Sequence, residues 1–189
     1  ISLSLSPGWF LDSTPISTES CADPLHCSVE LNLKKGVTAW APNVNAKCAS
    51  AKTSGVDLWH CLMGHYVAPY LTTQLFVFQW QFDKAQLYHD AITNDPSDDP
   101  TELAYAQQSA ANLTATFRAA KGHHHFFSPS CYQHVVLNNK QHEWVSLAVG
   151  ETTLPDALDR FVRGAENITL FLDTCETPDC NPTCPPPQI

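Results

Sequence analysis

Two residues of this 189-residue chain, Asp83 and His134, are of types that could share acid–base chemistry. Asp83 closely follows the run 75–80, in which five residues are apolar and which is typical of a strand that is buried on both faces. An acid just past the carboxyl end of such a strand stands where open α/β sheets place their chemistry. Asp83 is also a suitable N-cap for the segment KAQLYHD, and this stretch alone favours the capping interpretation.

His134 lies three residues after Cys131 in the segment SPSCYQH. In α/β-hydrolases the catalytic triad follows the chain order serine, acid, histidine. Asp83 and His134 match the last two members of this order. In such a triad the histidine accepts the serine proton, and the carboxylate fixes its tautomer and stabilises the imidazolium. The serine is missing, because no G-x-S-x-G occurs and the segment TSG at 53–55 lacks the preceding glycine and strand.

Metal chemistry is an alternative for the other histidines and for some cysteines. His123 and His125 would share one face of a strand, but no carboxylate or thiol stands beside them at a recognisable ligand spacing. Cys175, Cys180 and Cys184 could bind zinc, yet disulfides are favoured in a secreted chain. We therefore expect neither a metal nor another cofactor.

The charge balance excludes several classes of partner. The formal net charge is −9, from 10 basic and 19 acidic residues, so no basic surface for nucleic acid or anionic lipid is expected. No apolar run approaches the roughly 20 residues that a membrane-spanning helix needs. The hydrophobic content of 43% suits one domain with a sizeable core.

The cysteines and two N-glycosylation sequons indicate an oxidising, secretory compartment. The sequons begin at Asn112 and Asn167, so we expect an extracellular glycoprotein whose signal peptide lay upstream of Ile1. The even number of cysteines predicts disulfides, and a local one could join Cys21 to Cys27. The eight cysteines are Cys21, Cys27, Cys48, Cys61, Cys131, Cys175, Cys180 and Cys184.

Hydrophobic periodicity and capping signals predict the elements that must position these residues. Strands are expected at 1–6, 75–80, 125–127, 135–137, 144–149 and 168–173. Helices are expected at 24–35, where Gly36 weakens a further turn, as a short element near 59–66, at 100–121 and at 154–164. The inward faces of the last two are predicted to be Leu103, Ala106, Ala110, Leu113 and Phe117, and Leu154, Leu158, Phe161 and Val162.

Ordered sequence blocks along nearly the whole chain resemble the Notum-like carboxylesterases, which are related to the pectin acetylesterases. The most specific blocks contain the candidate acid and base. The blocks are GWFLD at 8–12, Cys21 and Cys27, KKG at 34–36 with Trp40, Cys48, Trp59 with Cys61, FVFQWQFDKAQL at 76–87, SPSCYQH at 128–134, Trp144, TTLPDAL at 152–158 and DTCETPDCNPTCP at 173–185.

The resemblance implies that residues 1–189 are the C-terminal part of a single α/β-hydrolase domain, with a mainly parallel sheet flanked by helices and stabilised by disulfides. Residues 174–189 would be a Cys- and Pro-rich tail. Asp83 and His134 would match the acid and base of the triad. The serine nucleophile and the oxyanion-hole amides would come from an upstream segment or a second chain.

The resemblance also implies an acyl pocket. Phe10 would match its aromatic wall, and Leu33 and Ala85 would match smaller lining positions. Leu62 and Met63 stand where the family has two phenylalanines, which keeps the pocket apolar but changes its shape. Thr73 replaces a family cysteine, so the disulfide set differs as well.

The implied function is the acid–base half of a secreted serine carboxylesterase that hydrolyses an O-acyl ester, such as the palmitoleoyl ester that the family removes from a serine of Wnt proteins. The alternatives are a deacetylase of cell-wall or matrix glycans and a catalytically inactive extracellular binding or structural protein. The esterase is favoured, because an unused site has little chemical reason to keep both Asp83 and His134 in triad order.

Overall fold

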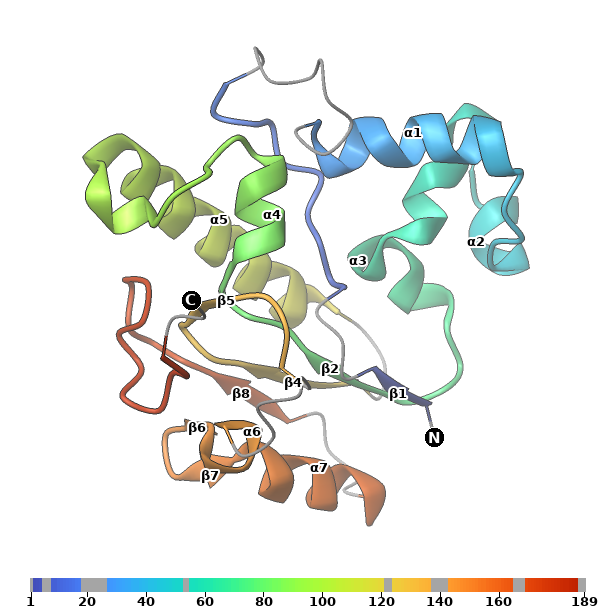
Figure 1. The fold of residues 1–189 in the computed structure, drawn as a ribbon. Helices are drawn as coiled ribbons and strands as arrows, with labels where there is room; N and C mark the ends of the chain where they lie inside the picture. Colours follow the sequence, from blue (N-terminus) through green and yellow to red (C-terminus); the bar gives the residue numbers. More distant parts are fainter. Residues whose placement is uncertain are drawn as a thin grey trace.

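The structure, a computed structural model, describes residues 2–4, 8–17, 27–52, 55–120, 124–136, 143–164 and 169–186. At its centre is a four-stranded parallel sheet in the order β1-β2-β4-β8 (Figure 1). Its strands are β1 (Ser2–Ser4), β2 (Leu75–Phe78), β4 (His125–Ser128) and β8 (Leu170–Leu172). The predicted parallel sheet is therefore confirmed.

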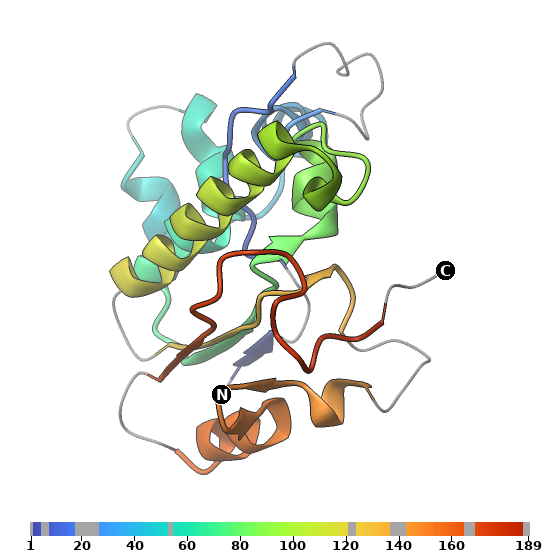
Figure 2. The same ribbon diagram turned by 90° about the vertical axis from the view of Figure 1, so that its left-hand side faces the viewer.

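Both faces of the sheet are covered, which explains why the central strands are apolar throughout. Helix α5 (Pro100–Ala119) crosses one face, and α7 (Leu154–Val162) lies on the other (Figure 2). Val77 and Phe126 pack with Phe117 of α5. The alternate residues of β2 and β4 pack with Phe161 of α7 in the largest cluster of the core.

The two covering helices begin at the predicted caps. Asp99 accepts hydrogen bonds from the first turn of α5, and Thr153 accepts one from Asp156 N in α7. The predicted inward face of α5 is buried except for the half-buried Leu103. In α7 the prediction for Val162 is wrong: its side chain is exposed, and Ala157 is buried instead.

Helix α1 (Val29–Trp40) runs five residues beyond the predicted end at Lys35. It is capped by Ser28, and the predicted start at 24–26 lies outside the described residues. Gly36 lies within the helix and does not end it, and the ring of Trp40 occupies the space beside it. A Cβ at Gly36 would lie 2.4 Å from Trp40 Cζ3, so glycine permits this close approach.

Two predicted strands are wrong. Val135 and Val136 follow a short strand, β5 (Tyr132–Gln133), and do not extend it. The segment 144–149 begins as a helical turn, α6 (Glu143–Ser146), and only then enters β6 (Ala148–Val149), which pairs with β7 (Thr152–Thr153). Trp144 and Leu147, three residues apart, both pack on the main core, and this spacing suits a helical turn better than a strand.

A helical layer lies beside α1 and consists of α2 (Ala46–Ser50), η2 (Gly55–Leu62) and α3 (Gly64–Val67). The remaining elements are short: η3 (Ala68–Tyr70), β3 (Phe82–Asp83), α4 (Lys84–His89) and η4 (Pro96–Asp98). Among the described residues, no helix is long and apolar enough to cross a membrane.

The tail after β8 is an irregular loop, as predicted, and disulfides hold it. One joins Cys175 to Cys180, and another joins Cys131 to Cys184; a third, Cys48–Cys61, lies in the helical layer. Each of the seven described cysteines is disulfide-bonded. Cys21 lies outside the described residues.

Candidate active site

Asp83 and His134 lie at the carboxyl ends of two strands that continue the pairing of the main sheet. After β2 the chain enters β3, and after β4 it enters β5. These short strands are parallel, with Asp83 opposite Gln133. His134 therefore leaves β5 beside Asp83, although 51 residues separate them in the sequence.

The Asp83 carboxylate is buried and makes the contacts that both interpretations of this residue require. Its Oδ1 atom accepts hydrogen bonds from the backbone N–H groups of Ala85 and Gln86, at 2.9 and 3.0 Å, and so caps α4. The same atom lies 3.0 Å from His134 Nδ1, and Oδ2 lies 3.1 Å from it. Capping and orienting the histidine are thus compatible functions of one side chain.

The carboxylate determines which nitrogen of His134 carries a proton. An ionised carboxylate only accepts hydrogen bonds, so Nδ1 must be the protonated nitrogen of the neutral ring. This leaves the lone pair on Nε2 available to accept a proton. The hydrogen bond to Asp83 raises the pKa of His134, and burial opposes that increase. This arrangement can support general base catalysis.

Gln79 is a further contact of the site that the sequence did not identify. Its Nε2 donates a hydrogen bond to Asp83 Oδ2 at 3.0 Å, and the contact is buried. The available signal was the pattern FVFQWQF, because glutamines within a buried strand need internal partners.

The segment that carries His134 is held by the tail. The Cys131–Cys184 disulfide fixes the chain three residues before His134. Two hydrogen bonds act alongside it: Ser130 N donates to Asp173 Oδ2, and Gln133 Nε2 donates to Pro185 O. The tail thus positions the histidine from outside the sheet.

Of the residues predicted to line an acyl pocket, three pack in one cluster and two do not. Met63 is buried in a cluster with Val29 and Trp59, and Phe10 and Leu33 pack against this cluster. The Phe10 ring also stacks on the His134 imidazole, with centroids 6.2 Å apart and an interplanar angle of 23°. Leu62 is exposed and lies outside this cluster, and Ala85 lies on α4.

An open, mainly apolar hollow of about 360 Å³ borders His134. Its lining residues are Lys84, Ala85, Tyr88, His89, Ile92, Thr93, Tyr132 and His134. A larger hollow of about 520 Å³ lies between α5 and residues 173–176, and neither Asp83 nor His134 lines it. The smaller hollow is therefore the one that chemistry at His134 could use.

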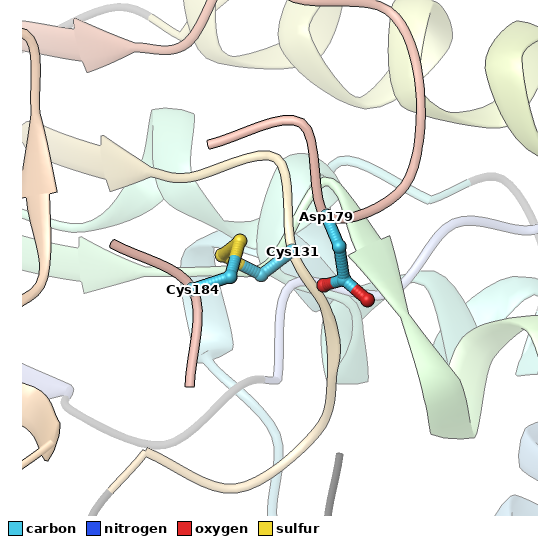
Figure 3. A group of neighbouring side chains, drawn as sticks. All are labelled: Cys131, Asp179 and Cys184. Atoms are coloured by element: carbon cyan, nitrogen blue, oxygen red, sulfur yellow. A yellow bond between two sulfur atoms is a disulfide. The ribbon is translucent and has the colours of Figure 1, made fainter. Parts of the chain in front are cut away.

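One group of potential metal ligands lies near the site, but its donors are occupied. Cys131, Asp179 and Cys184 lie close together (Figure 3). The two sulfurs form a disulfide, so they offer no thiolate, and Asp179 Oδ1 accepts a hydrogen bond from Tyr132 N.

Two other predictions based on side-chain chemistry are only partly covered by the structure. His125, a disfavoured metal ligand, is buried with its ring against Phe161, and His123 lies outside the described residues. Asn112 is exposed on α5, as a glycosylated asparagine must be, and Asn167 lies outside the described residues.

Comparison with known proteins gives consistent matches along the chain. The pectinacetylesterase family model matches residues 2–185. Palmitoleoyl-protein carboxylesterase notum1 of Xenopus laevis is 29% identical and its human counterpart NOTUM is 30% identical, each over 94% of this chain. This chain spans 38% and 37% of the length of these two relatives.

A solved structure matches as well. The Wnt deacylase Notum from Drosophila superposes with a TM-score of 0.79 at 27% identity, over 97% of this chain and 48% of that chain. The α/β-hydrolase fold and the resemblance to Notum-like carboxylesterases are thereby confirmed. The match of the family model over nearly the whole sequence shows that the chain belongs to the pectinacetylesterase family.

Proposed function

We propose that this chain supplies the acid and the base of a secreted serine carboxylesterase that hydrolyses an O-acyl ester. The observation that carries the proposal is the pair formed by Asp83 and His134, in which Nδ1 lies 3.0 Å from a buried carboxylate oxygen. Relatives that are named palmitoleoyl-protein carboxylesterases support the reaction class.

In this mechanism, His134 Nε2 accepts the proton of a serine hydroxyl as the serine attacks the ester carbonyl. Asp83 stabilises the resulting imidazolium. His134 then gives the proton to the leaving alkoxide, and in the second half of the reaction it activates the water that releases the acid. The serine and the oxyanion donors would come from an upstream segment or a second chain.

The proposed substrate is a lipid ester on a protein. Phe10 stacks on His134 and Ala85 lines the hollow beside the imidazole, so these two residues would contact the acyl chain. Leu33 and Met63 belong to the cluster that packs with Phe10 and would support this wall, with Leu62 at its margin. The thioether of Met63 adapts its shape, so the wall would suit acyl chains of more than one shape. Three disulfides in the described residues support a secretory location.

The test uses the native, full-length protein and a fluorophosphonate probe, followed by hydrolysis of p-nitrophenyl esters of acetate and octanoate. Labelling of a serine, together with faster turnover of octanoate, would support a lipid carboxylesterase. Turnover of acetate alone would favour the glycan deacetylase. Absence of labelling and turnover would overturn the proposal in favour of the binding protein.

His134→Gln is the matched variant, because it keeps a polar side chain but removes the base. The control is His65→Gln, which changes the other described histidine that contacts an aspartate. The probe should label the His65 variant and fail to label the His134 variant. Equal labelling of both variants would contradict the assignment of His134.

A further inference from the structure

Gln79 binds two parts of the candidate site with a single amide group. Its Oε1 accepts a hydrogen bond from Trp9 N at 2.9 Å, and its Nε2 donates to Asp83 Oδ2 at 3.0 Å. The orientation of this amide is determined, because a backbone N–H can only donate. The carbonyl oxygen must therefore face Trp9, which directs the amide nitrogen to the carboxylate.

Gln86 makes a parallel set of contacts without touching the Asp83 carboxylate through its side chain. Its Oε1 accepts a hydrogen bond from Leu11 N at 2.7 Å. Its Nε2 donates to Asp90 Oδ2 at 2.9 Å and to Ser13 Oγ at 3.3 Å. The side chains of the two buried glutamines therefore bind the same chain segment, but only the Gln79 side chain also binds the Asp83 carboxylate.

These bonds bracket Phe10. The residues on either side, Trp9 and Leu11, are buried, whereas Phe10 is half-buried and stacks on His134. Binding of both flanking N–H groups fixes the backbone on each side of Phe10. The ring is thus held over the histidine by the two glutamines.

We infer that Gln79 is a positioning residue that holds the acid Asp83 and the aromatic wall Phe10 in one fixed arrangement around His134. The inference rests on the proposed function for its catalytic meaning. Gln79 reaches the reacting groups only through other residues. Its amide is the shared contact of the carboxylate and the Phe10 segment.

The contact with Asp83 has a consequence that simple packing would not have. A hydrogen bond donated to a carboxylate stabilises its charged form and weakens it as a base. Gln79 Nε2 and His134 Nδ1 both approach Asp83 Oδ2, so loss of the Gln79 donor should strengthen the contact with the imidazolium and raise the pKa of His134. Loss of Gln86 should loosen the Phe10 segment equally but leave this pKa unchanged.

The other titratable groups around His134 stay constant in such a test. They are Lys84, Tyr88 and His89 on α4 and Tyr132 on β5, all of which line the hollow beside the imidazole. Because the Gln79 side chain bonds to Trp9 N and to Asp83 Oδ2, a change in the titration of His134 would report on Asp83.

The experiment compares Gln79→Met, Gln86→Met and Gln79→Glu in the native, full-length protein. Methionine keeps the approximate volume but removes the amide. Glutamate keeps an oxygen for Trp9 N but places a second carboxyl beside Asp83, which should raise the pKa of His134 further. The readouts are the NMR titration of the His134 imidazole and, separately, kcat and KM for ester hydrolysis.

We expect both methionine variants to raise KM, because both free the Phe10 segment. Only Gln79→Met should also lower kcat, by about tenfold, and move the His134 titration upward by roughly half a pH unit or more. Gln79→Glu should move it furthest. The Gln86 variant should titrate like the wild type.

Two results would overturn the inference: a His134 titration that does not change in Gln79→Met, or one that changes equally in Gln86→Met. If Gln79→Met does not fold, the titration of Gln79→Glu decides the question. If the wild type hydrolyses no ester, the proposed function fails. The pH at which His134 titrates in each variant would still test the contact between Gln79 and Asp83, because that measurement does not depend on activity.

Discussion

Asp83–His134 and Asp12–His65 are two histidine–aspartate pairs with opposite distributions of burial. In the first, the carboxylate side chain is 2% exposed and the histidine side chain 38% exposed. In the second, the aspartate is 29% exposed and the histidine only 12%, with His65 Nε2 lying 3.2 Å from Asp12 Oδ1. The first pair therefore presents its base to solvent, and the second encloses it.

The pKa values follow this difference. The hydrogen bond to the buried Asp83 raises the pKa of His134, whereas burial lowers the pKa of His65 despite the nearby Asp12. Tyr66 also donates a hydrogen bond to Asp12 at 2.7 Å, so that aspartate serves to join α3 to the segment 8–12. Of these two pairs, the one with the enclosed acid and the accessible histidine is therefore the catalytic candidate.

The largest expected effect separates the two histidines. His134→Gln removes the general base, and by the size of such losses in serine hydrolases kcat should fall by about 10⁶-fold. His65→Gln should leave kcat within about tenfold, since it removes a contact with Asp12 and leaves the pair of Asp83 and His134 intact. Steady-state hydrolysis of a p-nitrophenyl ester by the native protein measures both. Similar losses in the two variants would refute the distinction.

The second prediction concerns the two acids. Asp83→Asn keeps an oxygen that can cap α4 but no longer requires the proton on Nδ1, so kcat should fall by about 10⁴-fold. The unfolding temperature should change little. Asp12→Asn should show the reverse pattern, a lower unfolding temperature with kcat nearly retained. Thermal unfolding and turnover of the same preparations test both expectations.

The disulfides provide a third comparison, between the region of His134 and the helical layer. The sequence separations are 53 residues for Cys131–Cys184 and 13 for Cys48–Cys61. Chain entropy predicts losses in the free energy of unfolding of about 4 and 3 kcal/mol when each pair is changed to serine. Only the first change should also reduce kcat, because it releases His134. Denaturant unfolding and turnover check the two effects, and an equal loss of kcat would argue against the tail as a support for the histidine.

The smallest predicted effect is the dependence of stability on pH. The raised pKa of His134 favours the folded state at low pH, and this contribution is lost as the pH rises through the folded value. The lowered pKa of His65 acts the other way, because the unfolded chain binds that proton more tightly than the folded protein does. The free energy of unfolding therefore decreases as the pH falls below 6.5, the ordinary pKa of histidine. His134→Gln should therefore make the protein more sensitive to acid, and His65→Gln less so. The measurement is the unfolding temperature of each variant and of the wild type as a function of pH. If both variants changed the pH dependence in the same direction relative to the wild type, the opposite pKa shifts of the two histidines would be contradicted.

Local sequence signals were sufficient for part of this site. A strand followed by an acid and a capped helix predicts the place of Asp83, and triad order then selects His134. The capping residues Asp99 and Thr153 likewise located α5 and α7. Such signals depend on neighbours in the chain, so they can be read without the fold.

The contacts that were missed are long-range. Gln79 and Trp9 are 70 residues apart, and Asp12 and Tyr66 are 54 apart. No local pattern reveals which buried amide meets which N–H, because several partners are chemically equivalent until the chain is folded. The wrong strand at 144–149 has a related cause, since contacts of Trp144 and Leu147 with the core decided between a turn and a strand.

The double task of the Asp83 carboxylate bears on how a member of this family could lose its activity. A lineage without catalysis would still need a capping side chain at the start of α4, so an acid or amide at position 83 would persist for stability alone. His134 caps no helix: its ring is partly exposed, and within the described ranges its Nδ1 contacts the Asp83 carboxylate. Relaxed selection would therefore erase the histidine first. The identity of residue 134, more than that of residue 83, marks whether a relative still needs its base.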